Sequence, residues 1–335
     1  MEYIKKYLEC KGGFTYYDKL NSLEKEIYDK LLSAFLNYQL NVTFYNVSDE
    51  KVQEIIHYVL YDHPYIFYIS HEFLMNCYKD HVEFIFKLVY NKAKIKKLNK
   101  KIDKEIKKLV KLVKAKSKNY YDEILMVNSI ICSTIKVYNP SIFDFEDGHL
   151  VGALLNKKAR CEGVTKLTTL LLRILGYQAS MIHGYAWYDR QTNTRHAWNL
   201  LYFENKYYHM DFSYNLSYSS SSFYCKSHLF LSDKEVFVNH KYVKNIGYPI
   251  CNDESVNYFR VLNQVVKNDD YSNIKTYNYG KYIRVEFKLT NQLSERKLEE
   301  MLPSIIINKL KIDPWKDVVY KYVESLNDVY LLIYL

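Results

Sequence analysis

Cys161 stands beside an acid and a glycine, in "ARCEGV", directly before a run of apolar residues with helical spacing. Buried cysteines usually lie within an apolar face as small hydrophobic side chains, but this cysteine precedes that face. The unpaired N–H groups and the dipole at a helix N-terminus favour a thiolate, which is the form of cysteine that attacks acyl carbons. The position therefore predicts a nucleophile.

A nucleophilic cysteine needs a general base and a group that orients the base. A two-residue hairpin turn at Glu204 and Asn205, between two strand-like runs, sets the register of those strands. In that register His196 faces Ser213. Asp211 then lies diagonally from His196 on the same face, close enough for their side chains to meet. The spacing therefore predicts a histidine–aspartate pair.

Two kinds of element must position these side chains. The helix after the cysteine has a stop signal at Gly176, and its apolar face consists of Val164, Leu167, Leu170, Leu171, Ile174 and Leu175. From Gln178 the hydrophobic period changes to two, and three strand-like runs follow: "QASMIHGYAWY", "HAWNLLYF" and "KYYHMDFS". A helix followed by antiparallel strands predicts the α+β class.

Three motifs resemble those of a known family. "RCEGVTKLTTLLLRILGY", "HAWNLLYF" and "YYHMDFSYN" look like the cysteine, histidine and aspartate motifs of the transglutaminase-like superfamily, in its bacterial branch. The separations, 35 positions from Cys161 to His196 and 15 from His196 to Asp211, are typical of that family. The resemblance covers about residues 120–240.

The resemblance implies a papain-like α+β core in which the helix that carries the cysteine packs on an antiparallel sheet. It makes Cys161 the nucleophile, His196 the general base and acid, and Asp211 the orienting residue of a catalytic triad. The family includes cross-linking transglutaminases, peptidases, peptide N-glycanases and members without activity. This chain departs from many relatives at Asn215, where they have a second acid.

Three further residues are expected to support the site. Glu162 and Gly163 are expected to shape the turn into the helix and to leave backbone N–H groups free for an oxyanion. Trp198 is expected either to wall the site or to pack in the core.

Other polar residues near the motifs are not assigned to the site. His183 and His209 lie on predicted strands without a matching partner, so core or surface roles are expected for both. The second oxyanion donor stays open, because the sequence places neither His149 nor Asn156.

The chain divides into three expected regions: a helical N-terminal region over 1–118, a catalytic core over 119–240 and a small α/β addition over 241–335. In the first region Asn21 and Ser48 occupy positions typical of helix N-caps. The addition contains the strand-like runs "KYIRVEFKL" and "DVYLLIYL" and a helix that Pro303 is expected to interrupt.

The net charge of +9 comes from one segment. Residues 91–118 contain thirteen lysines against Asp103 and Glu105, so the rest of the chain has a net charge of −2. Apolar residues recur every three or four positions there, which predicts an amphipathic helix. Neither arginine nor an aromatic residue is interleaved with the lysines, so a solvated face is favoured over a nucleic-acid or anionic-surface site.

The motifs favour a cysteine-dependent enzyme that transfers the acyl group of an amide in a protein or peptide through a thioester. Hydrolysis by a peptidase or amidohydrolase is the preferred outcome. The alternatives are a protein-glutamine transglutaminase, which uses an amine acceptor, and a non-catalytic binding scaffold. No cofactor or metal is expected, because the sequence has neither a C-x-x-C motif nor a calcium loop.

The N-terminus lacks the uninterrupted apolar core of a signal peptide, and no segment approaches the roughly 18 apolar residues that span a bilayer. A cytoplasmic protein without membrane or nucleic-acid partners is therefore expected. In that reducing compartment its six cysteines are expected to remain thiols. The sequence identifies neither the substrate nor the oligomeric state.

Overall fold

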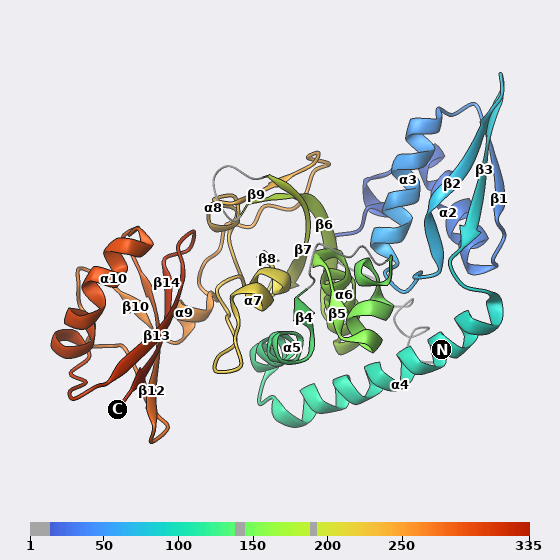
Figure 1. Cartoon of the computed structure of the whole chain (residues 1–335). Helices are drawn as coiled ribbons and strands as arrows, with labels where there is room; N and C mark the ends of the chain where they lie inside the picture. Colours follow the sequence, from blue (N-terminus) through green and yellow to red (C-terminus); the bar gives the residue numbers. More distant parts are fainter. Residues whose placement is uncertain (1–13, 138–144, 188–192) are drawn as a thin grey trace.

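The computed structural model describes residues 14–137, 145–187 and 193–335. Helices make up 42% and strands 26% of the structure, so the mixed α+β class is confirmed. Figure 1 shows three sheets that follow one another in chain order, from blue and cyan at one end of the molecule, through green, to orange and red at the other.

The N-terminal region contains a three-stranded antiparallel sheet as well as helices. Its strand order is β1-β3-β2, with bounds β1 Asn41–Tyr45, β2 Ile69–Cys77 and β3 His81–Leu88. The helices are η1 Tyr17–Lys19, α2 Ser22–Leu36, α3 Asp49–Asp62 and α4 Lys92–Lys116. The region over 1–118, expected to be helical, therefore contains strands as well as helices. The signal for β3 is present in "HVEFIFKL", where alternate residues, Val82, Phe84 and Phe86, are buried.

Both predicted N-caps in this region are confirmed. Asn21 accepts a hydrogen bond from the backbone N–H of Glu24 and completes a capping box at the start of α2. Ser48 accepts a hydrogen bond from the backbone N–H of Lys51 at the start of α3.

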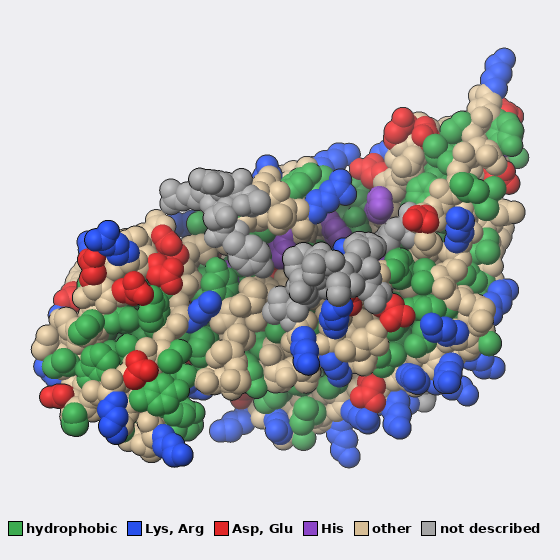
Figure 2. Space-filling model, viewed as in Figure 1, with side chains coloured by type: hydrophobic (Ala, Val, Ile, Leu, Met, Phe, Trp, Pro, Cys, Tyr) green, Lys and Arg blue, Asp and Glu red, His purple; other side chains and the backbone are tan. Residues whose placement is uncertain are grey.

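Helix α4 is the predicted lysine-rich helix, and one side of it is buried. Ile95, Ile102, Ile106 and Val113 are at most 1% exposed, whereas the lysines of the helix are largely exposed. In Figure 2 blue side chains line the edge of the molecule where Figure 1 places α4. The amphipathic helix is therefore confirmed.

The middle region is a four-stranded antiparallel sheet with helices packed around it. The strand order is β8-β7-β6-β9. The strands are β6 Gln178–Ala186, β7 Thr194–Phe203, β8 Lys206–Met210 and β9 His240–Tyr242, and the short parallel pair β4 Lys136–Val137 and β5 Lys158–Ala159 lies apart from them. The helices are α5 Tyr120–Thr134, η2 Phe145–Gly148, η3 Gly152–Asn156, α6 Cys161–Leu175, α7 Phe212–Tyr218 and α8 Asp233–Val236. The predicted two-residue turn is confirmed, because Phe203 pairs with Lys206.

Helix α6 packs on strands β6 and β7. Its first apolar residues, Val164, Leu167, Leu170 and Leu171, are at most 2% exposed. The helix ends at the predicted stop, since Gly176 has a φ of 103°, a left-handed conformation that glycine adopts without strain.

The C-terminal region has a sheet of its own. Its strand order is β10-β12-β14-β13, with β11 also paired to β12. The elements are α9 Tyr258–Val261, β10 Val265–Val266, β11 Thr276–Asn278, β12 Tyr282–Leu289, α10 Glu295–Ser304, η4 Ile305–Lys309, β13 Asp317–Val323 and β14 Asp328–Tyr334. Pro303 does not interrupt α10 as expected: the helix runs through it to Ser304 and continues as the wider turn η4.

The hydrophobic packing connects these regions. One cluster of buried side chains extends from Leu20 in the N-terminal region to Phe230 in the middle region. The C-terminal sheet forms a second cluster with α10, and a third cluster packs Tyr330 of β14 against Phe223 and Val236 of the middle region. The two predicted boundaries between the three regions stay a prediction.

Within the part of the chain that the structure describes, no helix is both long and apolar enough to cross a membrane. The described cysteines, Cys77, Cys132, Cys161, Cys225 and Cys251, are free thiols. Cys10 lies outside the described residues.

Candidate active site

Cys161 is the first residue of α6 and is partly exposed. Arg160 is the N-cap and has an extended backbone, with φ −85° and ψ 173°. No side-chain hydrogen bond caps the helix from Arg160. The thiol therefore lies where the backbone N–H groups of the first turn point out of the helix.

His196 on β7 and Asp211 after β8 form a buried hydrogen bond. His196 Nε2 lies 2.6 Å from Asp211 Oδ2, and the two residues are 7% and 1% exposed. The predicted contact is therefore present, and the predicted register holds from the Phe203–Lys206 pair to the Asn199–Met210 pair. The predicted pairing of His196 with Ser213 is wrong, because the strand is shorter than expected. Strand β8 ends at Met210 instead of continuing to Ser213, because Asp211 caps helix α7. Aspartate is among the residues that N-caps prefer.

The carboxylate of Asp211 accepts hydrogen bonds at both oxygens. Oδ1 accepts from the backbone N–H of Ser213 at 2.9 Å, from the Ser213 hydroxyl at 2.7 Å and from the backbone N–H of Tyr214 at 2.9 Å. Oδ2 faces His196 and also His240 Nε2, which lies 3.0 Å away. The carboxylate is thereby held in one orientation.

These contacts determine which nitrogen of His196 carries a proton. An ionised carboxylate only accepts hydrogen bonds, so His196 donates from Nε2. The side chain of Cys161 lies near the ring and interacts favourably with its charged form, which helps to raise the pKa of His196. Because Nε2 is taken by Asp211, Nδ1 is the nitrogen that serves the cysteine.

The charges of the site raise one pKa and lower the other. Burial works against a charged imidazole, but the charge of Asp211 and the nearby Cys161 outweigh it and raise the pKa of His196 to about 10. Burial would likewise raise the pKa of Asp211. Its interactions with His196 and His240 outweigh burial and hold that pKa well below its usual range. The arrangement favours an imidazolium beside a carboxylate.

Residues 107–212 match the family model described as the transglutaminase-like superfamily, a segment that contains Cys161, His196 and Asp211. This chain carries a transglutaminase-like domain.

Solved structures with similarity to the chain are distant. A transglutaminase crystal structure has 13% identity over 52% of this chain and 50% of its own, with a TM-score of 0.30. A candidate cysteine protease from Cytophaga hutchinsonii has 13% identity over 43% of this chain and 63% of its own, with a TM-score of 0.27. A candidate protease from Parabacteroides distasonis has 10% identity over 79% of this chain and 62% of its own, with a TM-score of 0.27.

The chain therefore spans between 50% and 63% of the length of these structures. Comparison with curated proteins gave no match.

Glu162 and Gly163, which were expected to shape the turn into the helix, differ from that expectation in their position. Glu162 and Gly163 lie inside the first turn of α6 and do not form a turn before it. Glu162 Oε1 lies 2.7 Å from the Lys166 ammonium. A Cβ at Gly163 would lie 2.5 Å from the Asp147 carbonyl oxygen, so glycine is required there for close packing.

Trp198 is fully buried in a hydrophobic cluster and also lies beside the ring of His196, so its contacts agree with both expected roles. Its ring lies nearly parallel to that of His196, with centroids 6.2 Å apart. Its indole N–H donates to His209 Nδ1 at 3.0 Å, and His209 Nε2 lies 2.9 Å from Asp233 Oδ1. The expectation that His209 has no partner is therefore wrong. The pairing follows from the isolated bridge between His209 and Leu231, which no local pattern indicates.

His183 and the two upstream candidates, His149 and Asn156, have partners other than the His196–Asp211 pair. His183 stacks on Tyr61 with centroids 3.7 Å apart, and burial lowers its pKa to about 3. His149 is buried, with Nδ1 3.4 Å from the Lys166 ammonium. The side-chain amide of Asn156 donates to Glu146 at 2.6 Å. None of these contacts assigns a second oxyanion donor.

Sequence reasoning missed His240. It lies on β9, which pairs with β6 between residues more than fifty positions apart. A three-residue strand has no periodicity to read, so only the sheet pairing brings His240 to Asp211.

Two clusters combine the residue types that bind metals: His196, Asp211 and His240, and His209, Asp233 and Cys251. In the first, 2.6 Å between His196 Nε2 and Asp211 Oδ2 fits a hydrogen bond and leaves no room for an ion between them. In the second, His209 Nδ1 accepts from Trp198, so the neutral ring carries its proton on Nε2, the atom a metal would need. Hydrogen bonding therefore accounts for both clusters.

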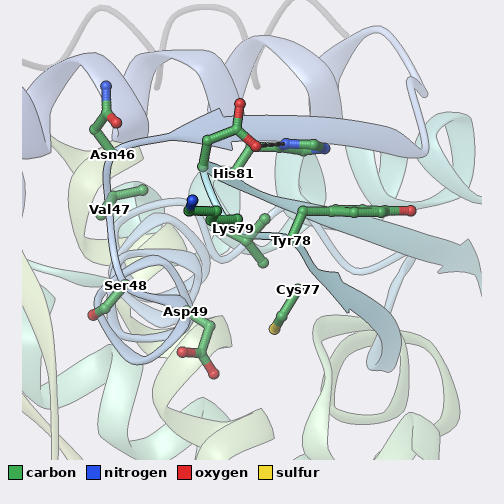
Figure 3. Close-up of a pocket in the computed structure, with 10 residues that line it drawn as sticks. Asn46, Val47, Ser48, Asp49, Cys77, Tyr78, Lys79 and His81 are labelled. Carbon is green, nitrogen blue, oxygen red and sulfur yellow. Dashed lines mark hydrogen bonds and ion pairs between the residues drawn. The ribbon is translucent and has the colours of Figure 1, made fainter.

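A cavity of about 300 Å³ lies far along the chain from this site, at the tip of the N-terminal sheet. Figure 3 shows Tyr78 and His81 one above the other on one side of it and Ser48 and Asp49 on the other. The rings of Tyr78 and His81 are 4.3 Å apart. None of the candidate site residues lines this cavity.

Proposed function

We propose that this chain is a cysteine-dependent enzyme that transfers the acyl group of an amide bond in a protein or peptide. Cys161 is the nucleophile, His196 the general base and acid, and Asp211 the residue that orients His196. The observation that carries the proposal is the buried hydrogen bond of 2.6 Å between His196 and Asp211. Cys161, at the start of α6, interacts with the same His196 ring.

In the first half of the reaction, the proton of Cys161 moves to His196 Nδ1 and the thiolate attacks the amide carbon. The carbonyl oxygen gains negative charge, which the backbone N–H groups of the first turn of α6 are placed to stabilise. His196 then gives its proton to the departing nitrogen as the C–N bond breaks. The products are a thioester on Cys161 and a free amine or ammonia.

The second half decides the class of the enzyme. Water, deprotonated by His196, attacks the thioester carbon and releases a carboxylic acid and the thiol. An amine in place of water would make a new amide, as in a transglutaminase. We favour hydrolysis, because the described residues show no built site for an acceptor amine.

Alkylation tests the nucleophile. Wild-type protein is treated with a limiting amount of iodoacetamide near neutral pH, and the rate at each cysteine is measured by peptide mass mapping. Cys161 is expected to react much faster than the exposed Cys77, and His196→Ala and Asp211→Asn are expected to abolish the difference. Equal rates at the two cysteines of the wild type would favour a non-catalytic binding scaffold.

Product analysis tests the reaction type. The protein is incubated with an unfolded protein rich in glutamine and lysine, with Cys161→Ala as the control. Mass spectrometry is expected to detect peptide cleavage or conversion of glutamine to glutamate. Glutamine–lysine cross-links without either product would contradict hydrolysis and indicate a transglutaminase.

A further inference from the structure

His240 contacts the same carboxylate oxygen as His196. Its Nε2 lies 3.0 Å from Asp211 Oδ2, and both side chains are at most 1% exposed. The two imidazole rings are 5.3 Å apart and inclined by 65°. One carboxylate oxygen thus receives two ring N–H groups from different directions.

We propose that His240 is a positioning residue for the reaction proposed above, on which this inference rests. By occupying one side of Asp211 Oδ2, it confines the hydrogen bond of His196 to the other side. The direction of that bond sets the plane of the His196 ring, and therefore where Nδ1 points relative to Cys161.

The surroundings of His240 hold its own ring in place. Nδ1 of His240 lies 2.6 Å from the side-chain oxygen of Asn239. The backbone carbonyl of Asn239 accepts a hydrogen bond from the backbone N–H of Trp187 at 3.1 Å. Burial lowers the pKa of His240, so the ring is neutral and its Nδ1 accepts a hydrogen bond. Asn239 donates this hydrogen bond when the NH₂ group of its side-chain amide faces Nδ1 of His240. The oxygen and the NH₂ group of an amide are nearly isosteric, so the side chain fits in either orientation.

The same amide reaches the C-terminal region. Its other end lies 3.4 Å from the hydroxyl of Ser325, between β13 and β14. Hydrogen bonds therefore run from the C-terminal sheet through Asn239 and His240 to Asp211. The family match ends at residue 212, so this support comes from parts of the chain outside the matched segment.

A second buried histidine shows that proximity alone does not make this contact. His228 is fully buried and lies close to Tyr214, as His240 does. Neither of its ring nitrogens has a hydrogen-bond partner among the described residues. Of these two histidines, only His240 hydrogen-bonds Asp211.

The test compares His240→Ala with His240→Gln in the full chain. The amide NH₂ of glutamine lies near the position of a histidine Nε2, so His240→Gln keeps the donor. The rate constant for iodoacetamide at Cys161 is measured near neutral pH, with near-UV circular dichroism to show that each variant is folded. His240→Ala is expected to slow alkylation about tenfold, the effect of losing one hydrogen bond to a charged group, and His240→Gln to restore most of the rate.

His63→Gln is the matched control for a general loss of stability. His63 also hydrogen-bonds through both ring nitrogens, to Tyr28 and Tyr65, but does not contact Asp211. The variant His63→Gln is expected to lower the melting temperature without changing the rate of alkylation at Cys161. A purely structural role of His240 would give the same result as His63→Gln.

Two outcomes overturn the positioning role: wild-type rates in His240→Ala, or equal losses in the alanine and glutamine variants. Slow labelling of Cys161 in the wild type would overturn the proposed function itself, and it is recognised without any variant.

Discussion

At the scale of single residues, Asp211 combines two tasks. One oxygen caps helix α7 and the other receives His196 and His240. In the variant Asp211→Asn the amide oxygen could still cap the helix, but the NH₂ group would face His196 Nε2. That nitrogen would then have to accept, and the proton would move to Nδ1, the atom required to take the proton of Cys161.

The raised pKa of His196 predicts a pH-dependent stability. A histidine whose folded pKa is about 10 stabilises the fold fully below its ordinary value of about 6.5, and the contribution is lost as the pH rises through the folded value. In a Cys161→Ala background the contribution of Cys161 to this shift is removed, but Asp211 still raises the pKa of His196. The free energy of unfolding is therefore expected to fall by up to about 1.4 kcal/mol per pH unit above pH 6.5, over a narrower pH range than in the wild type.

Urea denaturation between pH 6 and pH 9 measures this slope. Adding Asp211→Asn in the same background removes the carboxylate that raises the pKa, so the slope is expected to flatten. Parallel slopes with and without the carboxylate would contradict the charge interaction.

At the scale of elements, α4 shows how a highly charged helix is stabilised. Thirteen lysines over 91–118 repel one another, and the helix is held by its buried isoleucine and valine side chains. Packing of an amphipathic face is the main source of helix stability in proteins. The lysines account for the net charge, and they lie on the other side of the helix from the core.

Substitutions on the two faces of α4 are therefore expected to differ. Ile106→Ala removes a side chain that is 1% exposed and is expected to lower the free energy of unfolding by about 2–5 kcal/mol. Lys111→Ala, on the exposed face, is expected to change it by less than about 0.5 kcal/mol. Chemical denaturation of both variants measures the difference, and similar losses would argue against the packing of α4.

At the scale of the whole molecule, the C-terminal sheet is connected to the middle region by packing and by polar contacts. The hydroxyl of Tyr330 on β14 accepts from the backbone N–H of Lys226 at 2.9 Å and lies 3.0 Å from the hydroxyl of Ser227. Tyr330 is 2% exposed, so these bonds are shielded from water.

Tyr330→Phe tests this connection. The backbone N–H of Lys226 would lose its acceptor in a partly buried position, which is expected to cost about 1–3 kcal/mol of unfolding free energy. Tyr334→Phe, on the same strand, is the control, because the described part of the chain shows no hydrogen bond of its hydroxyl. Equal stability of the two variants in urea would show that the contact with residues 226–227 does not stabilise the protein.

The sequence by itself determined the α+β class, the start of α6 at Cys161, the stop at Gly176 and the hairpin turn before Lys206. These features depend on neighbours in the chain: helix caps, glycine conformation and hydrophobic period act over a few residues. The same local patterns brought His196 and Asp211 within reach of each other.

Only the tertiary structure decided the parts that depend on distant pairing. His240 reaches Asp211 because β9 adds to the edge of β6, His209 meets Asp233 across an isolated bridge, and Tyr330 comes from a separate sheet. The end of β8 at Met210 also depends on the tertiary structure, because Asp211 caps helix α7 instead of continuing the strand. Contacts between segments far apart in the chain leave no spacing in the sequence, so these partners were visible only after the chain was folded.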